Sequence, residues 1–249
     1  QNDDIIVPAL FDHMGKAGVK TLGLIGTADP YGENWAKVAT GLAEKQGIRI
    51  VANEKFQRSD SSVTGQNLRL IGARPDAILV AAPGGAAVLP QLGLFDDGYP
   101  GQVYQTHGAA LPDYLKLGGK KIEGTILAAS GMLVLDEIPD SNASKQVARA
   151  YVDAYKARYG QVPATFGANV YDAGLLLQQA VPIAAKAGQP GSEAFRVALR
   201  DALEQTREMV GTQGVYNMSA ADHSGFDARG RELIIVKDGG WKLLASAKK

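Results

Sequence analysis

The chain has 249 residues, of which 45% are apolar and 21% are charged, and it contains no cysteine. Lys plus Arg and Asp plus Glu number 26 each, so the formal net charge is zero, which disfavours a general binder of nucleic acid or of acidic membranes. The lack of cysteine excludes disulfides and thiolate metal sites. No apolar run approaches the ~20 residues of a membrane span, and no signal peptide is recognisable.

The residue pattern predicts alternating helices and strands over residues 1–130. An amphipathic helix over 5–17 precedes a short apolar strand over 19–26 that ends in glycine. Asp29 and Pro30 then predict a helix start, because Asp caps helix N-termini and proline fits the first helical position. The alternation continues with expected strands at 48–56, 76–82, 102–107 and 122–129, separated by expected helices at 61–73, 83–95 and 110–119. Strands that alternate with helices predict an open, mostly parallel α/β sheet with helices on both faces.

The alternation stops after residue 130. Helices are expected over 144–160, 164–188 and 192–205, with no strand between them. A terminal hairpin is expected over 231–246, with its turn at Asp238-Gly239-Gly240. The apolar faces of the helical segment need a partner surface, and the chain supplies no second parallel sheet to provide one.

Candidate ligand-binding residues follow the strands, because ligands of an open parallel sheet gather at the carboxyl ends of its strands. These residues are Tyr31, Pro83, Gly84, Thr106, His107 and Met132. Tyr31 and His107 combine a ring with a polar tip, Gly84 allows close approach to the backbone, and nearby helix N-termini favour an anion. Each also has a structural explanation: Tyr31 can close the core, Pro83-Gly84 can be a turn, and His107 can be a hydrogen-bonded structural histidine, while His13 is expected on a helix surface.

The sequence contains no constellation typical of an enzyme. "GLIGTA" lacks the spacing of a dinucleotide fingerprint, and "PGGAAV" lacks the lysine of a phosphate loop. Asp222, His223 and Ser224 are consecutive, so they cannot form a triad by themselves, and neither HExxH nor G-x-S-x-G occurs. We therefore expect a binding protein with no catalytic residue, metal or cofactor.

Several long segments resemble one family. "GVKTLGLIGTADPYGENWAKVATGLAEKQGIRIV" resembles the opening of the second lobe in type I periplasmic solute-binding proteins, with "DPYG" at the family's usual junction. "ARPDAILVAAPGGAAVLPQLGLFD" and "AYVDAYKARYGQVPATFGANVYDAGLLLQQAV" resemble later strands and helices, and "GTQGVYNMSAADHSGFDARGRELIIVKDGGWKLL" resembles the closing segment. The resemblance covers essentially the whole chain in order and spacing.

This resemblance implies a two-lobed α/β protein, the binding component of an ABC importer, that closes on a small solute by hinge motion. Residues 1–130 and 212–249 would form the second lobe, and 131–211 would be the helical remnant of a first lobe that largely lies outside this chain. The implied partners are a small-molecule solute and a membrane permease, with no nucleic acid, and the implied location is the periplasm. Unpaired helix faces would favour self-association or completion by a missing N-terminal fragment.

The resemblance also suggests a class of solute. Tyr31 falls on the family tyrosine that commonly lines the cleft, and Pro83-Gly84 falls where a cleft residue follows the third strand. His107 falls near the position where amino-acid binders carry an acidic group for the ammonium, but "QTHGAA" has no carboxylate. We therefore expect a small hydrophobic or aromatic carboxylate. The alternatives are an amino-acid or amide binder, a sensory or regulatory module of the same fold and, behind these, an α/β enzyme.

Overall fold

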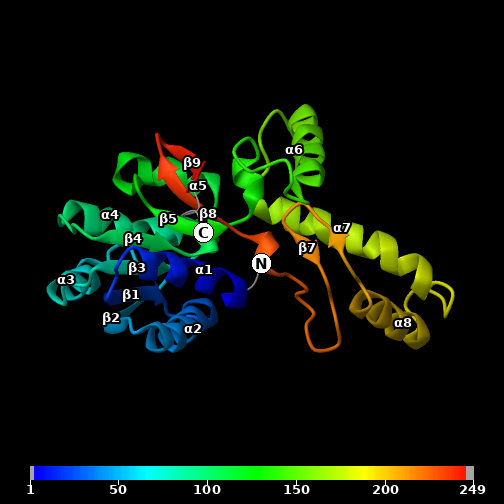
Figure 1. Cartoon of the computed structure of the whole chain (residues 1–249), viewed down its shortest axis with the longest axis horizontal. Helices are drawn as coiled ribbons and strands as arrows, with labels where there is room; N and C mark the ends of the chain where they lie inside the picture. Colours follow the sequence, from blue (N-terminus) through cyan, green and yellow to red (C-terminus); the bar gives the residue numbers. More distant parts are fainter. Residues whose placement is uncertain (1–2, 245–249) are drawn as a thin grey trace. The chain divides into compact units, whose positions relative to one another are not determined.

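The computed structural model describes residues 3–244, which divide into two compact units (Figure 1). Residues 3–129 and 232–244 form one, which we call the sheet unit, and residues 130–231 form the other, the helical unit. The return segment that we expected to begin at 212 begins at 232 in this division. Which lobe of the family fold each unit represents stays a prediction.

The sheet unit is built on a seven-stranded sheet with the order β2-β1-β3-β4-β5-β8-β9. Its strands are β1 (Thr21–Thr27), β2 (Arg49–Phe56), β3 (Ala77–Ala81), β4 (Gln102–Gln105), β5 (Ile126–Ala129), β8 (Glu232–Lys237) and β9 (Gly240–Leu243). The first five strands in this order pair in parallel, whereas β8 is antiparallel to β5, and β9 to β8. The predicted open, mostly parallel sheet is confirmed, and the predicted terminal hairpin extends one of its edges.

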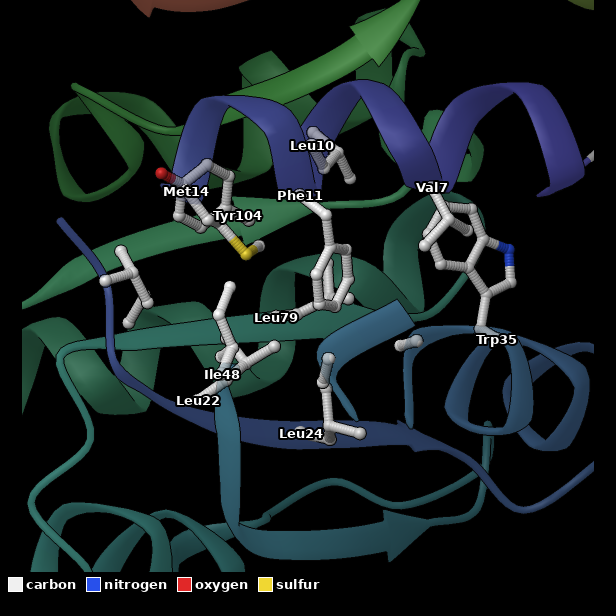
Figure 2. Close-up of a cluster of buried hydrophobic side chains, with 14 of the residues drawn as sticks. Val7, Leu10, Phe11, Met14, Leu22, Leu24, Trp35, Ile48, Leu79 and Tyr104 are labelled. Carbon is white, nitrogen blue, oxygen red and sulfur yellow. The ribbon is translucent and has the colours of Figure 1, made fainter. Parts of the chain in front are cut away.

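Helices cover both faces of this sheet (Figure 1). Helices α1 (Asp3–Lys16) and α2 (Pro30–Gln46) pack on one face, while α3 (Thr64–Gly72), α4 (Val88–Asp96) and α5 (Pro112–Gly118) pack on the other. Strand β3 shows why both faces are covered: Leu79 joins the core under α1 and α2, whereas Ile78 and Val80 join the opposite core. Figure 2 shows Phe11 pointing from α1 toward the strands that carry Leu24 and Leu79.

Short helical turns follow three of the central strands, at the carboxyl ends where we expected a ligand. These are η1 (Gly84–Ala87) after β3, η2 (His107–Ala109) after β4, and η4 (Gly131–Val134), which follows β5 and begins the helical unit; η3 (Gly119–Ile122) follows α5. Strand β4 is shorter than the expected 102–107, since Thr106 O accepts from Ala109 N at 3.0 Å and His107 O accepts from Ala110 N at 3.0 Å. The backbone therefore turns at Thr106, and His107 lies in the turn.

The helical unit contains the expected helices and a small sheet that we did not expect. The helices are α6 (Lys145–Tyr159), α7 (Thr165–Ala184) and α8 (Glu193–Glu204), followed by the antiparallel pair β6 (Met209–Val210) and β7 (Val215–Tyr216) and by η5 (Ala228–Gly230). Ser192 caps α8 by accepting from Phe195 N at 3.2 Å. Exposed apolar side chains lie along α7, among them Phe166, Val170 and Ile183. Of the helices in residues 3–244, none combines the length and apolarity needed to cross a membrane.

Candidate functional site

The junction between β1 and α2 is held by the carboxylate of Asp29. Its Oδ1 accepts from Gly32 N at 3.1 Å and from the Thr27 hydroxyl at 2.9 Å, which confirms the predicted helix cap. Arg58 Nε donates to Oδ2 at 2.6 Å. Burial acts to raise the pKa of Asp29, but hydrogen bonds from Gly32, Arg58 and Thr27 outweigh it and hold this pKa below its ordinary value. Asp29 is thus a structural anion, occupied by its own neighbours.

Gly32 lets α2 start directly against the end of β1. A Cβ atom added to Gly32 would lie 2.1 Å from the carbonyl oxygen of Thr27. A larger residue would therefore displace the first turn of α2 from the strand. This close approach sets the position of Tyr31, the residue before Gly32, at the carboxyl end of β1.

A chain of hydroxyl groups joins the ends of neighbouring strands. Tyr31 Oη donates to Thr106 Oγ1 at 2.7 Å, and Thr106 Oγ1 lies 3.5 Å from the carbonyl oxygen of Ala82, to which it donates. Tyr31 follows β1, Ala82 follows β3 and Thr106 follows β4, so the chain crosses three strand ends. Thr106 is fully buried, and burial raises the pKa of the Tyr31 phenol, which therefore stays neutral at physiological pH.

His107 begins the turn beside this hydroxyl chain. The centroid of its ring lies 6.4 Å from that of Tyr31 and 5.9 Å from that of Trp35. The side chain is half-buried, and its Nδ1 atom is buried without a hydrogen-bond partner. Burial lowers the pKa of His107 to about 4, because the charged imidazolium loses more hydration than the neutral ring. His107 is therefore a neutral imidazole near pH 7.

Gly108 brings the end of β3 close to Tyr31. A Cβ atom at Gly108 would lie 2.6 Å from Tyr31 Oη and 3.1 Å from Pro83 Cα, so these three residues are in close contact. Gly84, which follows Pro83, has a φ of 59°, a backbone conformation that glycine adopts without strain. Its place at the start of η1 lets the chain turn sharply after β3.

Five of the six predicted site residues thus lie at one edge of the sheet unit, and we call them the strand-end cluster: Tyr31, Pro83, Gly84, Thr106 and His107. The sixth, Met132, belongs to the helical unit. It is buried in η4, where its backbone N donates to Ser130 Oγ at 3.2 Å. Whether these residues bind a solute stays a prediction.

Two further residues shape this cluster, Trp35 and Gly108, and neither is among the six predicted site residues. Trp35 follows Tyr31 by four positions, and that spacing places two side chains on the same helix face. The two rings lie 6.4 Å apart between centroids, and Trp35 is fully buried. The need for a small side chain at Gly108 arises from Tyr31, 77 positions earlier, so the neighbouring residues do not indicate it.

The strand-end cluster is suited to binding a solute through uncharged groups. None of its five side chains carries a charge near pH 7, and the nearby Asp29 is occupied by Gly32, Thr27 and Arg58. A neutral imidazole can donate one hydrogen bond and accept another. In residues 3–244, no group of three or more His, Cys, Asp or Glu side chains is arranged to hold a metal.

Comparisons with known proteins agree on one family. A family model described as "periplasmic binding protein" matches residues 1–228. An extracellular ligand-binding receptor from Rhodopseudomonas palustris is 40% identical with a TM-score of 0.94, over 98% of this chain and 68% of that one. A second such receptor, from strain HaA2 of that species, is also 40% identical with a TM-score of 0.92, over 97% of this chain and 67% of that one.

A leucine binding protein from Thermotoga maritima shares the fold, with a TM-score of 0.77 and 22% identity over 96% of this chain and 63% of that one. The comparison with curated proteins gives no match. The family model spans nearly the whole chain, and the fold and the order of elements agree with those of solved members. The chain therefore belongs to the type I periplasmic binding protein family, whose members bind solutes outside the cytoplasm.

Proposed function

We propose that this protein is the periplasmic solute-binding component of an ABC importer, and that it binds a small hydrophobic or aromatic carboxylate at the strand-end cluster. The observation that carries the proposal is the neutral state of His107, with Nδ1 buried and unpaired, at the strand end where the family resemblance expects an acidic group in amino-acid binders. A membrane permease is the proposed protein partner.

The missing negative charge argues against an α-amino acid as the solute. An ammonium group that leaves water needs an anionic or strongly accepting partner, because burying an unpaired charge is costly. The strand-end cluster offers one neutral imidazole and a threonine hydroxyl that already accepts from Tyr31. A carboxylate that leaves water needs hydrogen-bond donors instead, and the neutral imidazole can donate to one of its oxygens.

The remaining solute contacts are proposed from the family's mode of action. In it, a solute is enclosed by hinge closure of two lobes, and first-lobe groups complete the grip on a carboxylate. Met132 is kept as a proposed solute contact because it lies in η4, the turn that follows β5. A sensory or regulatory module would use the same cluster, so the class of solute can be tested independently of the protein partner.

Calorimetric titration of the full-length protein with benzoate, L-leucine and L-leucinamide tests the solute class. We expect heat of binding with benzoate and a raised melting temperature, because a ligand that binds the folded state stabilises it. L-leucine is expected to be inert. Binding of L-leucine or L-leucinamide with no response to benzoate would reverse the assignment and favour an amino-acid or amide binder.

Two matched substitutions at one position sharpen this test. His107→Gln keeps a neutral donor and acceptor, whereas His107→Glu adds the carboxylate that the cluster lacks. We expect His107→Glu to abolish benzoate binding through charge repulsion and His107→Gln to weaken it several-fold. Equal affinities of the two variants for benzoate would mean that the solute does not approach His107.

A further inference from the structure

The hydroxyl group of Tyr31 is already engaged within the protein. A phenol has one hydrogen to donate, and Tyr31 donates it to Thr106 Oγ1 at 2.7 Å. The backbone of Gly108 packs against the same oxygen so closely that a Cβ atom there would lie 2.6 Å away. A solute could receive a hydrogen bond from Tyr31 only if the contact with Thr106 were broken.

The two contacts of Tyr31 are with the residues on either side of His107 in the sequence. Thr106 precedes His107 and Gly108 follows it, so the phenol holds both neighbours of the imidazole-bearing position. In the η2 turn between them, Ala109 N donates to Thr106 O and Ala110 N donates to His107 O, each at 3.0 Å. The rings of Tyr31 and Trp35 lie beside the imidazole, at 6.4 and 5.9 Å between centroids.

The orientation of His107 is one that the surrounding residues must impose. Its Nδ1 atom is buried without a partner, which costs free energy relative to a ring that turns its polar atoms to water. No hydrogen bond to Nδ1 within residues 3–244 offsets that cost. The contacts of Tyr31 with the flanking residues, and the packing of Trp35, are what hold the ring.

We propose that Tyr31 is a positioning residue: through Thr106 and Gly108 it fixes the imidazole of His107, and His107 makes the polar contact with the solute. The second half of this statement rests on the function proposed above. The first half concerns the protein without solute, so the two can fail separately.

Nuclear magnetic resonance of the ligand-free chain tests the positioning. The chain has three histidines, so each imidazole can be assigned with single His→Gln variants and followed against pH. Tyr31→Phe keeps the ring and removes the hydroxyl. We expect the pKa of His107 to rise from about 4 by one unit or more toward 6.5 as the released imidazole reaches water. Within residues 3–244, the titratable groups that bear on this reading are the Tyr31 phenol of α2 and the Asp3 carboxylate of α1, which acts on that phenol.

Tyr104→Phe is the matched control. It removes a phenol hydroxyl from the same unit, but that hydroxyl contacts Nδ1 of His13, at 2.8 Å. We expect it to shift the resonances of His13 and to leave those of His107 unchanged. A His107 titration that is the same in Tyr31→Phe as in the natural chain, with the fold retained, would overturn the proposal.

Thr106 provides a second route to the same test. Thr106→Val removes the acceptor with little change in shape and should release His107 as Tyr31→Phe does, whereas Thr106→Ser keeps the hydroxyl and should restore the natural titration. If Tyr31→Phe does not fold, these two variants decide the question. The proposal is contradicted if Tyr31→Phe and Thr106→Val, where they fold, leave the pKa of His107 unchanged.

A double-mutant cycle on the full-length protein separates positioning from direct contact. With benzoate as the probe, Tyr31→Phe, His107→Gln and the double variant are compared. We expect the double variant to bind no more weakly than His107→Gln, because Tyr31 acts through His107. If the fold-losses in benzoate affinity of the two single variants multiply in the double variant, Tyr31 contacts the solute itself. Absence of benzoate binding by the natural protein would overturn the proposed solute class and leave the magnetic-resonance test of Tyr31 in force.

Discussion

The hydroxyl group of Tyr216 donates a hydrogen bond to Asp172 Oδ2 at 2.9 Å, deep inside the helical unit. The same carboxylate accepts from Thr212 N at 2.7 Å and from Gln213 N at 3.2 Å. Asp172 lies on α7 and is fully buried, while its partners lie on the β6–β7 hairpin about 40 positions later. One carboxylate therefore attaches the small sheet to the helix.

Removal of this carboxylate should destabilise the helical unit. In Asp172→Ala, two backbone N–H groups and a phenol lose their acceptor, and each unsatisfied buried group costs about 1–3 kcal/mol. We expect a loss of several kcal/mol, against about 1 kcal/mol for Tyr216→Phe, which removes one donor and leaves the backbone hydrogen bonds in place. Urea unfolding followed by circular dichroism measures both. Equal losses for the two variants would show that the backbone contacts add nothing.

Two glycines of the same helix should respond to alanine in opposite ways. Gly32→Ala places a Cβ atom 2.1 Å from Thr27 O, so α2 must shift, and overpacking of this kind costs about 1–3 kcal/mol. Gly41 has open space around its Cα, with no atom within 4 Å of an added Cβ. Gly41→Ala should stabilise the chain by about 0.5–1 kcal/mol, because alanine has the higher helix propensity. Melting temperatures of the two variants test this contrast. An unchanged melting temperature in Gly32→Ala would contradict the prediction.

His107 should make the stability of the sheet unit depend on pH between about 6.5 and 4. Its pKa is about 4 in the folded chain against 6.5 for an unperturbed histidine, so the unfolded chain binds a proton first as the pH falls. Stability is therefore fully present above pH 6.5 and decreases until the pH reaches about 4. Burial lowers the pKa of His13 as well, so the decrease belongs to both residues. In urea unfolding, the difference in the free energy of unfolding between pH 7.5 and 4.5 should be smaller in His107→Gln than in the natural chain. An unchanged difference would refute the contribution of His107.

The sequence predicted those features of the fold that arise from neighbouring residues. Asp29 and Pro30 carry the start of α2 in their own chemistry, and the apolar strands required a sheet covered on both faces. Carboxyl ends of parallel strands share one edge, which is why the sequence alone groups Tyr31, Thr106 and His107.

Features that depend on distant residues could not be predicted in this way. Strand β4 ends at Gln105 because the chain turns at Thr106, where Tyr31 contacts it. His13 was expected on a helix surface, but its Nδ1 lies 2.8 Å from the hydroxyl of Tyr104, 91 positions later. The strands of β6 and β7 have two residues each, too few for a periodic signal, and depend on Asp172 of another element.

The pairing of β5 with β8 has a consequence for protein engineering. Ala129 pairs directly with Glu232 in an antiparallel register, although the whole helical unit lies between them in sequence. The helical unit is therefore an insertion at the tip of what is otherwise a β-hairpin. A two-residue Asn-Gly turn between Ala129 and Glu232 would close that hairpin directly. The resulting shortened protein would consist of the sheet unit alone and would carry the strand-end cluster. It would lack the exposed apolar side chains of α7.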